Sequence, residues 1–143
     1  MKKITEVGIA VKDLEKTTKL LVDLLGGKAG EIIDVGIYGM RFRMVRLGNV
    51  DFEIMEPTDD NGVIAKFIKR RGEGLHHVAF AVENLAETLI FLKEKECNLI
   101  NEKPLGLLGG KVAFVHPSAF SGVMIELIEY PKGYVFPDGD ING

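Results

Sequence analysis

An internal repeat constrains the fold of this chain more than any other feature of its sequence. The segment EVGIAV at residues 6–11 recurs as HVAFAV at residues 77–82, 71 residues later, and the same offset aligns Leu14 with Leu85. The repeats also end alike, because FEIMEP and IELIEYP place Glu53 and Glu126 in corresponding positions, 73 residues apart. A drift of two residues across the intervening loops is typical of a duplicated unit. The sequence therefore predicts two copies of one structural motif.

Each copy has the pattern of a βαβββ module. In the first, alternating apolar residues predict a strand at 4–11, and Asp13 begins a helix that runs to Leu25. In the second, residues 75–82 form the strand and Asn84 begins the helix, with Glu87 completing a capping box. The other predicted strands cover residues 30–34, 40–47, 50–56, 98–100, 111–116 and 122–129, and residues 104–110 are predicted to be a flexible loop.

These modules predict a single α+β domain over residues 1–143. Module one covers about residues 4–57, a linking helix about residues 62–71, module two about residues 75–129, and an irregular tail residues 130–143. A chain of 143 residues that is 46% hydrophobic and 27% charged is long enough to bury a core.

The composition excludes several classes of partner. A net charge of -3 and a pI near 5.6, without a long block of Lys and Arg, argue against a nucleic-acid partner. No apolar run reaches the length of a membrane span, and the N-terminal segment MKKITEVG lacks the apolar core of a signal peptide. The single cysteine, Cys97, fits a reducing compartment. We therefore expect a cytoplasmic protein without a membrane partner.

The first strand of each module carries a polar residue on the same face as small ones. Glu6 and His77 hold this position, and the residues that share their faces are Gly8 and Ala10, and Ala79 and Ala81. Small side chains beside a polar one indicate a face that lines a cavity for a small molecule. The last strand of each module adds Glu53 and Glu126 to the same surface.

Three carboxylates and one imidazole on a single surface repel one another and lose hydration, and a divalent cation removes this conflict. We therefore predict a metal site formed by Glu6, Glu53, His77 and Glu126. Mixed oxygen and nitrogen ligands suit Mn, Co, Ni, Fe or Zn.

The segments AKFIKRRGEGLHHVAFAVENL and GGKVAFVHPSAFSGVMIELIE resemble the vicinal oxygen chelate superfamily of glyoxalase I, bleomycin-resistance proteins and extradiol dioxygenases, and are most similar to methylmalonyl-CoA epimerases. The superfamily pattern covers nearly all of residues 4–129. The resemblance implies a curved mixed sheet around a metal/ligand cavity, and a homodimer. It places metal ligands on His77, Glu126 and Glu53. The first-strand ligand, usually a histidine in epimerases, is Glu6 here.

The resemblance further implies an isomerase or epimerase that enolises a thioester or carbonyl substrate such as an acyl-CoA. In such a reaction a metal polarises the carbonyl while a base removes the neighbouring proton. Glu126 is the candidate catalytic base. Epimerases of this kind are expected to carry a second acidic residue just before the strand at 40–47, where this chain has Ile37 and Tyr38. Asp34 lies three or four residues too early.

Two other functions stay open at this point. One is a glyoxalase I-like lactoylglutathione lyase. The other is a metal-free small-ligand-binding protein of the bleomycin-resistance type, which Glu6 and the absent second acid favour. A dioxygenase is disfavoured because such sites pair two histidines with one carboxylate. The cations at Arg41, Arg43, Arg46 and residues 69–71 either meet anionic groups of a substrate or face solvent.

Overall fold

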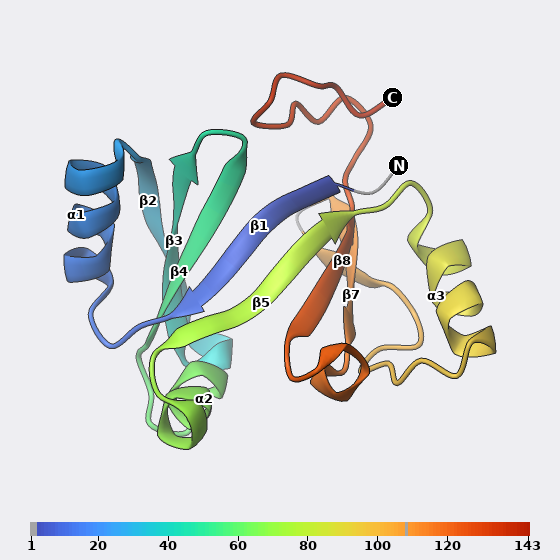
Figure 1. The fold of residues 1–143 in the computed structure, drawn as a ribbon, viewed down its shortest axis with the longest axis horizontal. Coiled ribbons are helices and arrows are strands. Elements are labelled where there is room, and N and C mark those ends of the chain that lie inside the picture. Colours follow the sequence, from blue (N-terminus) through green and yellow to red (C-terminus); the bar gives the residue numbers. More distant parts are fainter. Residues whose placement is uncertain (1–2, 108) are drawn as a thin grey trace. The chain divides into compact units, whose positions relative to one another are not determined.

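The computed structural model describes residues 3–107 and 109–143. Met1 and Lys2, which begin the N-terminal segment, and Leu108, which belongs to the predicted loop, lie outside the described residues. Each half of the chain follows the order βαβββ, which confirms the predicted α+β class and the tandem modules (Figure 1). The elements are β1 (Lys3–Ala10), α1 (Leu14–Leu25), β2 (Lys28–Val35), η1 (Gly36–Tyr38), β3 (Met40–Leu47), β4 (Val50–Pro57), α2 (Val63–Arg71), β5 (Gly74–Ala81), α3 (Leu85–Glu94), β6 (Leu105–Leu107), β7 (Gly110–Val115), η2 (Pro117–Phe120) and β8 (Met124–Glu129).

The chain forms two compact units. The N-terminal unit comprises Glu6–His76, and the C-terminal unit comprises His77–Gly143 together with the residues up to Thr5. Strand β1 therefore begins in the C-terminal unit and ends in the N-terminal unit, whereas β5 does the reverse.

The N-terminal unit is a four-stranded mixed sheet with a helix on each face. Its strand order is β2-β3-β4-β1, with β1 parallel to β4 and the other neighbours antiparallel. Helix α1 lies alongside β2, β3 and β4 (Figure 1) and buries Leu14 against Val11, Val45 and Ile54. Helix α2 buries Ile64 against a second cluster that contains Ala10 and Met55.

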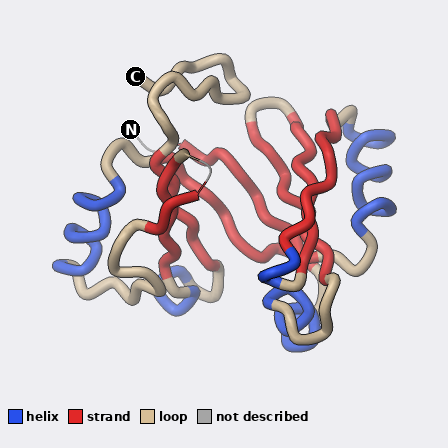
Figure 2. Tube along the Cα trace, turned by 180° about the vertical axis from the view of Figure 1, so that it is seen from behind, coloured by secondary structure: helices blue, strands red, loops and turns tan. Residues whose placement is uncertain are grey.

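The C-terminal unit repeats this plan with the strand order β5-β8-β7-β6. Strand β5 is parallel to β8, and β7 is antiparallel to β8 and β6. Helix α3, seen from behind in Figure 2, buries Leu85 and Leu89 against one face of this sheet. Val78, Phe80 and Val82 pack in that cluster, as their alternation predicts.

The polar residues that the sequence assigns to helix starts act as N-caps. The Asp13 carboxylate accepts a hydrogen bond from the Lys16 amide at 3.0 Å, and the Asn84 side chain accepts one from the Glu87 amide at 3.0 Å. Each bond satisfies a backbone donor that has no partner inside the helix. Helix α1 ends where Gly26 adopts a left-handed φ of 72°, which glycine tolerates at little cost.

Glu56 and Glu129 form a second pair of duplicated contacts, which the sequence does not predict. The amide of Leu14 donates to Glu56 Oε2 at 2.8 Å, and the amide of Leu85 donates to Glu129 Oε2 at 2.8 Å. Each carboxylate comes from the last strand of a module and binds the first turn of that module's helix. The donors are 71 residues apart and the acceptors 73, the same offsets that define the sequence repeat.

The prediction of a strand at residues 98–100 is wrong, and so is the flexible loop at 104–110. Residues 98–100 contribute only an isolated bridge between Leu99 and Val115. The fourth strand of this module is β6, in which Leu105 and Leu107 pair with Val112 and Gly110 of β7. Two glycines flank these leucines and make the segment look like a loop, but the partner strand supplies the ladder that holds it extended.

The tail that follows β8 is irregular, as predicted, and is drawn as loop in Figure 2. Tyr130, Tyr134 and Phe136 stack against one another. Lys3 Nζ lies 4.4 Å from the Phe136 ring centre and donates to Asp138 at 2.9 Å and Asp140 at 2.8 Å. These bonds, the one to Asp140 first, raise the pKa of Lys3, and the bond from Lys3 lowers the pKa of Asp138.

None of the helices formed by the described residues is long and apolar enough to cross a membrane.

Candidate functional site

His77 and Glu126 form a buried pair in the C-terminal unit. They come from the parallel strands β5 and β8, where Glu126 is in register with Ala79, two residues beyond His77 on the same face. The Nε2 atom of His77 lies 3.2 Å from Glu126 Oε2, and the two residues are only 4% and 7% exposed. Burying an imidazole and a carboxylate costs free energy unless they are paired or ligate a metal. The pair is therefore the most chemically distinctive feature of this unit.

The separation of these two atoms fits two ligands of one cation. Ligand atoms about 2.1 Å from a metal lie about 3.0 Å apart in octahedral geometry and about 3.4 Å apart in tetrahedral geometry. The observed 3.2 Å falls between these values. It also fits a hydrogen bond or ion pair between the side chains, so the distance is compatible with a metal without requiring one.

Small residues surround the pair on its own sheet, as predicted. Ala79 is fully buried and Ala81 is 7% exposed. Ala79 packs with Val112 and Ile128 in a compact cluster, so larger side chains from β7 and β8 fill the space next to it.

Glu6 and Glu53 form the corresponding half-buried pair in the N-terminal unit. Their strands β1 and β4 are parallel, with Gly8 in register with Glu53. Residues in register point to the same face, so Glu6, two residues before Gly8, shares that face with Glu53. Asp51, also on this face, makes a two-pronged ion pair with Arg46 at 2.9 and 3.0 Å. Each unit thus carries two of the four predicted metal ligands.

His76 and His116 have structural roles, as predicted. The His76 ring packs edge-on against Phe67, with 4.8 Å between ring centres. His116 precedes η2, and its Nδ1 accepts a hydrogen bond from the Ser118 amide at 3.1 Å.

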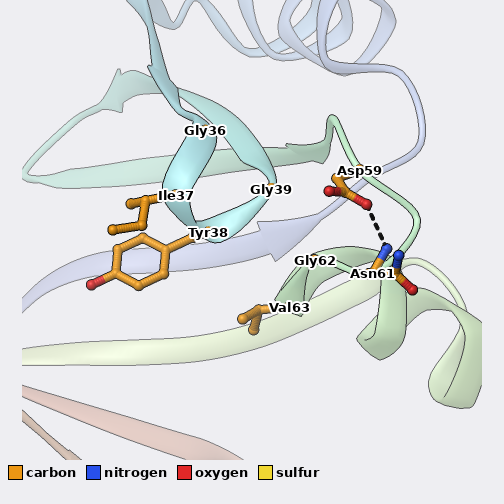
Figure 3. Close-up of a pocket in the computed structure, with 8 residues that line it drawn as sticks. All are labelled: Gly36, Ile37, Tyr38, Gly39, Asp59, Asn61, Gly62 and Val63. Atoms are coloured by element: carbon orange, nitrogen blue, oxygen red, sulfur yellow. Dashed lines mark hydrogen bonds between the residues drawn. The ribbon is translucent and has the colours of Figure 1, made fainter.

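The segment expected to hold a second acid is the short helix η1. Ile37 is 87% exposed and Tyr38 is 57% exposed. They line a pocket of about 170 Å³ together with Val63 at the start of α2, and the three side chains extend to the same side in Figure 3. On the other side of this pocket the Asp59 carboxylate accepts a hydrogen bond from the Asn61 amide at 2.8 Å. Apolar side chains therefore occupy the position where an acid was sought.

The three arginines of β3 are held by carboxylates. Arg46 pairs with Asp51, Arg41 with Glu56 at 3.3 Å, and Arg43 with Glu15 at 3.3 Å. These pairs favour the interpretation that the arginines stabilise the sheet.

The basic residues of α2 are arranged differently. Lys66, Lys69 and Arg70 line a concave surface of about 340 Å³. Lys66 was not singled out from the sequence, although its spacing of three and four residues from the other two places all three on neighbouring positions of one helix face.

Comparisons with known proteins agree with the fold and the repeat. Residues 5–114 match the family model described as the glyoxalase/bleomycin resistance protein/dioxygenase superfamily. The chain is 35% identical to the mitochondrial methylmalonyl-CoA epimerase of Bos taurus over 87% of its own length and 73% of the relative's. It is 30% identical to the ethylmalonyl-CoA/methylmalonyl-CoA epimerase of Cereibacter sphaeroides, covering 87% and 96%. The solved structure of a Streptomyces coelicolor methylmalonyl-CoA epimerase variant in complex with 2-nitronate-propionyl-CoA is similar with a TM-score of 0.80 and 25% identity, covering 89% and 93%.

Proposed function

We propose an enzymatic function for this chain, which belongs to the glyoxalase/bleomycin resistance protein/dioxygenase superfamily. It is an epimerase-like isomerase. Its substrate is an acyl-CoA thioester with an acidic α-proton, of the methylmalonyl-CoA type. The observation that carries this proposal is the buried His77–Glu126 pair, because it puts a carboxylate and an imidazole 3.2 Å apart in a chain whose relatives are acyl-CoA epimerases.

The proposed reaction includes a divalent cation held by Glu6, Glu53, His77 and Glu126. The support within each unit is the geometry described above: a buried imidazole and carboxylate in one, and two half-buried carboxylates on one sheet face in the other. One nitrogen and three carboxylate oxygens fit Mn, Co, Ni, Fe or Zn, and the residues present therefore fit a metal. When bound, such a cation supplies a Lewis acid for the thioester carbonyl oxygen.

Glu126 is the residue to which we assign proton transfer. Its Oε2 atom lies against His77, and we assign Oε1 to the proton removed from the α-carbon of the substrate. Burial at 7% exposure keeps bulk water away from the carboxylate, which makes it a stronger base toward a bound carbon acid. His77 orients Glu126 through their contact.

A second proton carrier is what separates epimerisation from simple proton exchange. Inverting a carbon centre requires that a proton leave one face of the enolate and return to the other. Ile37 cannot carry a proton, and the Tyr38 phenol is the titratable group closest to that position in sequence. We therefore propose that Glu126 exchanges the α-proton and that inversion is slower than exchange.

The test is to incubate one enantiomer of methylmalonyl-CoA with the protein in deuterated buffer and to follow deuterium uptake and inversion separately. We expect uptake with Mn, Co or Ni present and at least about a hundredfold loss in Glu126→Gln, the range over which general-base removal acts. Glu102→Gln is the matched control, because Glu102 is an exposed carboxylate paired only with Lys93. Absence of uptake with every metal contradicts the proposal, and turnover of a methylglyoxal hemithioacetal instead supports a lyase.

The predictions of a single domain and of a homodimer stay predictions. Light scattering on the purified chain tests the second, with twice the 15.7 kDa chain mass as the expected result.

A further inference from the structure

One face of helix α2 gathers positive charge in a way that its neighbours do not explain. Lys66, Lys69 and Arg70 are exposed and line the concave surface of about 340 Å³. Like charges three and four residues apart destabilise an isolated helix. Cations in a last turn gain from the helix dipole, which accounts for Lys69 and Arg70 but not for Lys66 in the middle of the helix.

These cations also lack the partners that the β3 arginines have. Within residues 3–107 and 109–143, Lys66 and Arg70 make no ion pair, whereas Arg41 and Arg43 are each paired with a glutamate. Lys69 donates only a long bond of 3.4 Å to the backbone oxygen of Asp60. A ligand with several anionic oxygens can therefore engage all three cations without displacing a carboxylate.

The basic face continues into the apolar pocket at the start of the helix. Val63, Lys66 and Arg70 follow one another at i, i+3 and i+7, so they form one stripe along α2 that is about 10 Å long. Val63 lies at the η1 end of this stripe and lines the pocket of about 170 Å³ with Ile37 and Tyr38 (Figure 3). The stripe thus begins with an aromatic and apolar wall and ends in cations, a sequence of surfaces that matches the base and the phosphates of a nucleotide.

We propose that α2 binds the nucleotide end of the acyl-CoA substrate, with the phosphates on Lys66, Lys69 and Arg70 and the adenine against Ile37 and Tyr38. This assignment rests on the proposed function, because it takes the substrate to be an acyl-CoA. The phosphates of coenzyme A carry several negative charges, and Lys and Arg bind such groups through charge-assisted hydrogen bonds. The net charge of -3 disfavours a long polyanion as the ligand of this face.

The direct test is calorimetric titration of adenosine 3′,5′-bisphosphate and of inorganic phosphate into the full chain. Replacing all three cations in K66Q/K69Q/R70Q should weaken nucleotide binding by about tenfold to a hundredfold. A matched variant, K12Q/K16Q/K19Q, removes three exposed lysines at and near α1 and should leave binding unchanged. Tyr38→Ala should weaken nucleotide binding by about fivefold while leaving the weaker phosphate binding unchanged, because only the nucleotide has a base to stack.

Turnover separates this proposal from the proposed function. In K66Q/K69Q/R70Q the KM for methylmalonyl-CoA should rise while proton exchange on methylmalonyl-pantetheine, which lacks the nucleotide, stays at the wild-type rate. If neither thioester exchanges but the α2 variant still loses nucleotide affinity, the function is wrong and the binding face is right. If the α2 and α1 variants bind the nucleotide equally well at unchanged melting temperature, the binding face is wrong.

Discussion

The two glutamates that bind helix starts should stabilise the protein to the same extent. Glu56 accepts from the Leu14 amide and Glu129 from the Leu85 amide, each at 2.8 Å. Each also has a cationic neighbour, at 3.3 Å for Glu56 and 3.7 Å for Glu129. Replacing either glutamate with alanine removes a charged acceptor and leaves the first turn of a helix without its partner.

Three contributions set the size of the effect. A hydrogen bond to a charged group contributes about 1.5–3 kcal/mol, a negative charge at a helix N-terminus about 0.3–1 kcal/mol, and a partly exposed ion pair about 0–1 kcal/mol. The carboxylate side chains are 18% and 27% exposed, which weakens all three. We therefore expect each alanine variant to lose about 2 kcal/mol of unfolding free energy, and each glutamine variant about half as much because an acceptor oxygen remains.

Thermal unfolding measures this directly. A chain of 143 residues has an unfolding entropy of about 0.3 kcal/mol/K, so 2 kcal/mol corresponds to a fall of about 7 °C in Tm. Glu102→Ala, which removes a carboxylate that is 63% exposed and pairs with Lys93, is the control and should shift Tm by less than about 2 °C. The reasoning is refuted if Glu56→Ala and Glu129→Ala lower Tm no more than this control does.

Two other predictions concern the loop before β3 and the tail. In Gly62→Ala the new Cβ would lie 2.7 Å from the backbone oxygen of Gly39, so we expect a loss of about 1–3 kcal/mol by chemical denaturation; an unchanged midpoint would show that the loop gives way freely. The tail should stay attached above the ordinary pKa of an aspartate and detach as the pH falls through the lowered pKa of Asp138, because protonation removes the charge that Lys3 binds. Tyrosine fluorescence reports detachment, and a Lys3→Met variant that shows the same pH response would contradict this assignment.

The sequence predicts those elements whose signals are local. Asp13 and Asn84 mark helix starts because a short polar side chain can bind a nearby amide regardless of tertiary context. The repeat predicts the strand order of both modules, since a duplicated unit must bury the same faces twice. His77 and Glu126 follow from the same pattern, and the structure brings their side chains into contact.

What the sequence could not show depends on partners far along the chain. Leu105 and Leu107 look like loop residues because β7, which pairs with them, is the reason that they are extended. Glu56 and Glu129 appear as ordinary polar residues at strand ends, and only the return of the chain past each helix start gives them a role. The face of α2 is a charge run in the sequence, and its concave shape appears only in three dimensions.

Metal analysis of the purified, untreated protein tests the central claim most directly. The proposed centre predicts about one divalent cation per chain, and loss of that cation in His77→Gln and in Glu126→Gln but not in Glu102→Gln. Metal retained in full by His77→Gln and Glu126→Gln, or a wild-type protein that binds no Mn, Co, Ni, Fe or Zn after reconstitution, would contradict the account.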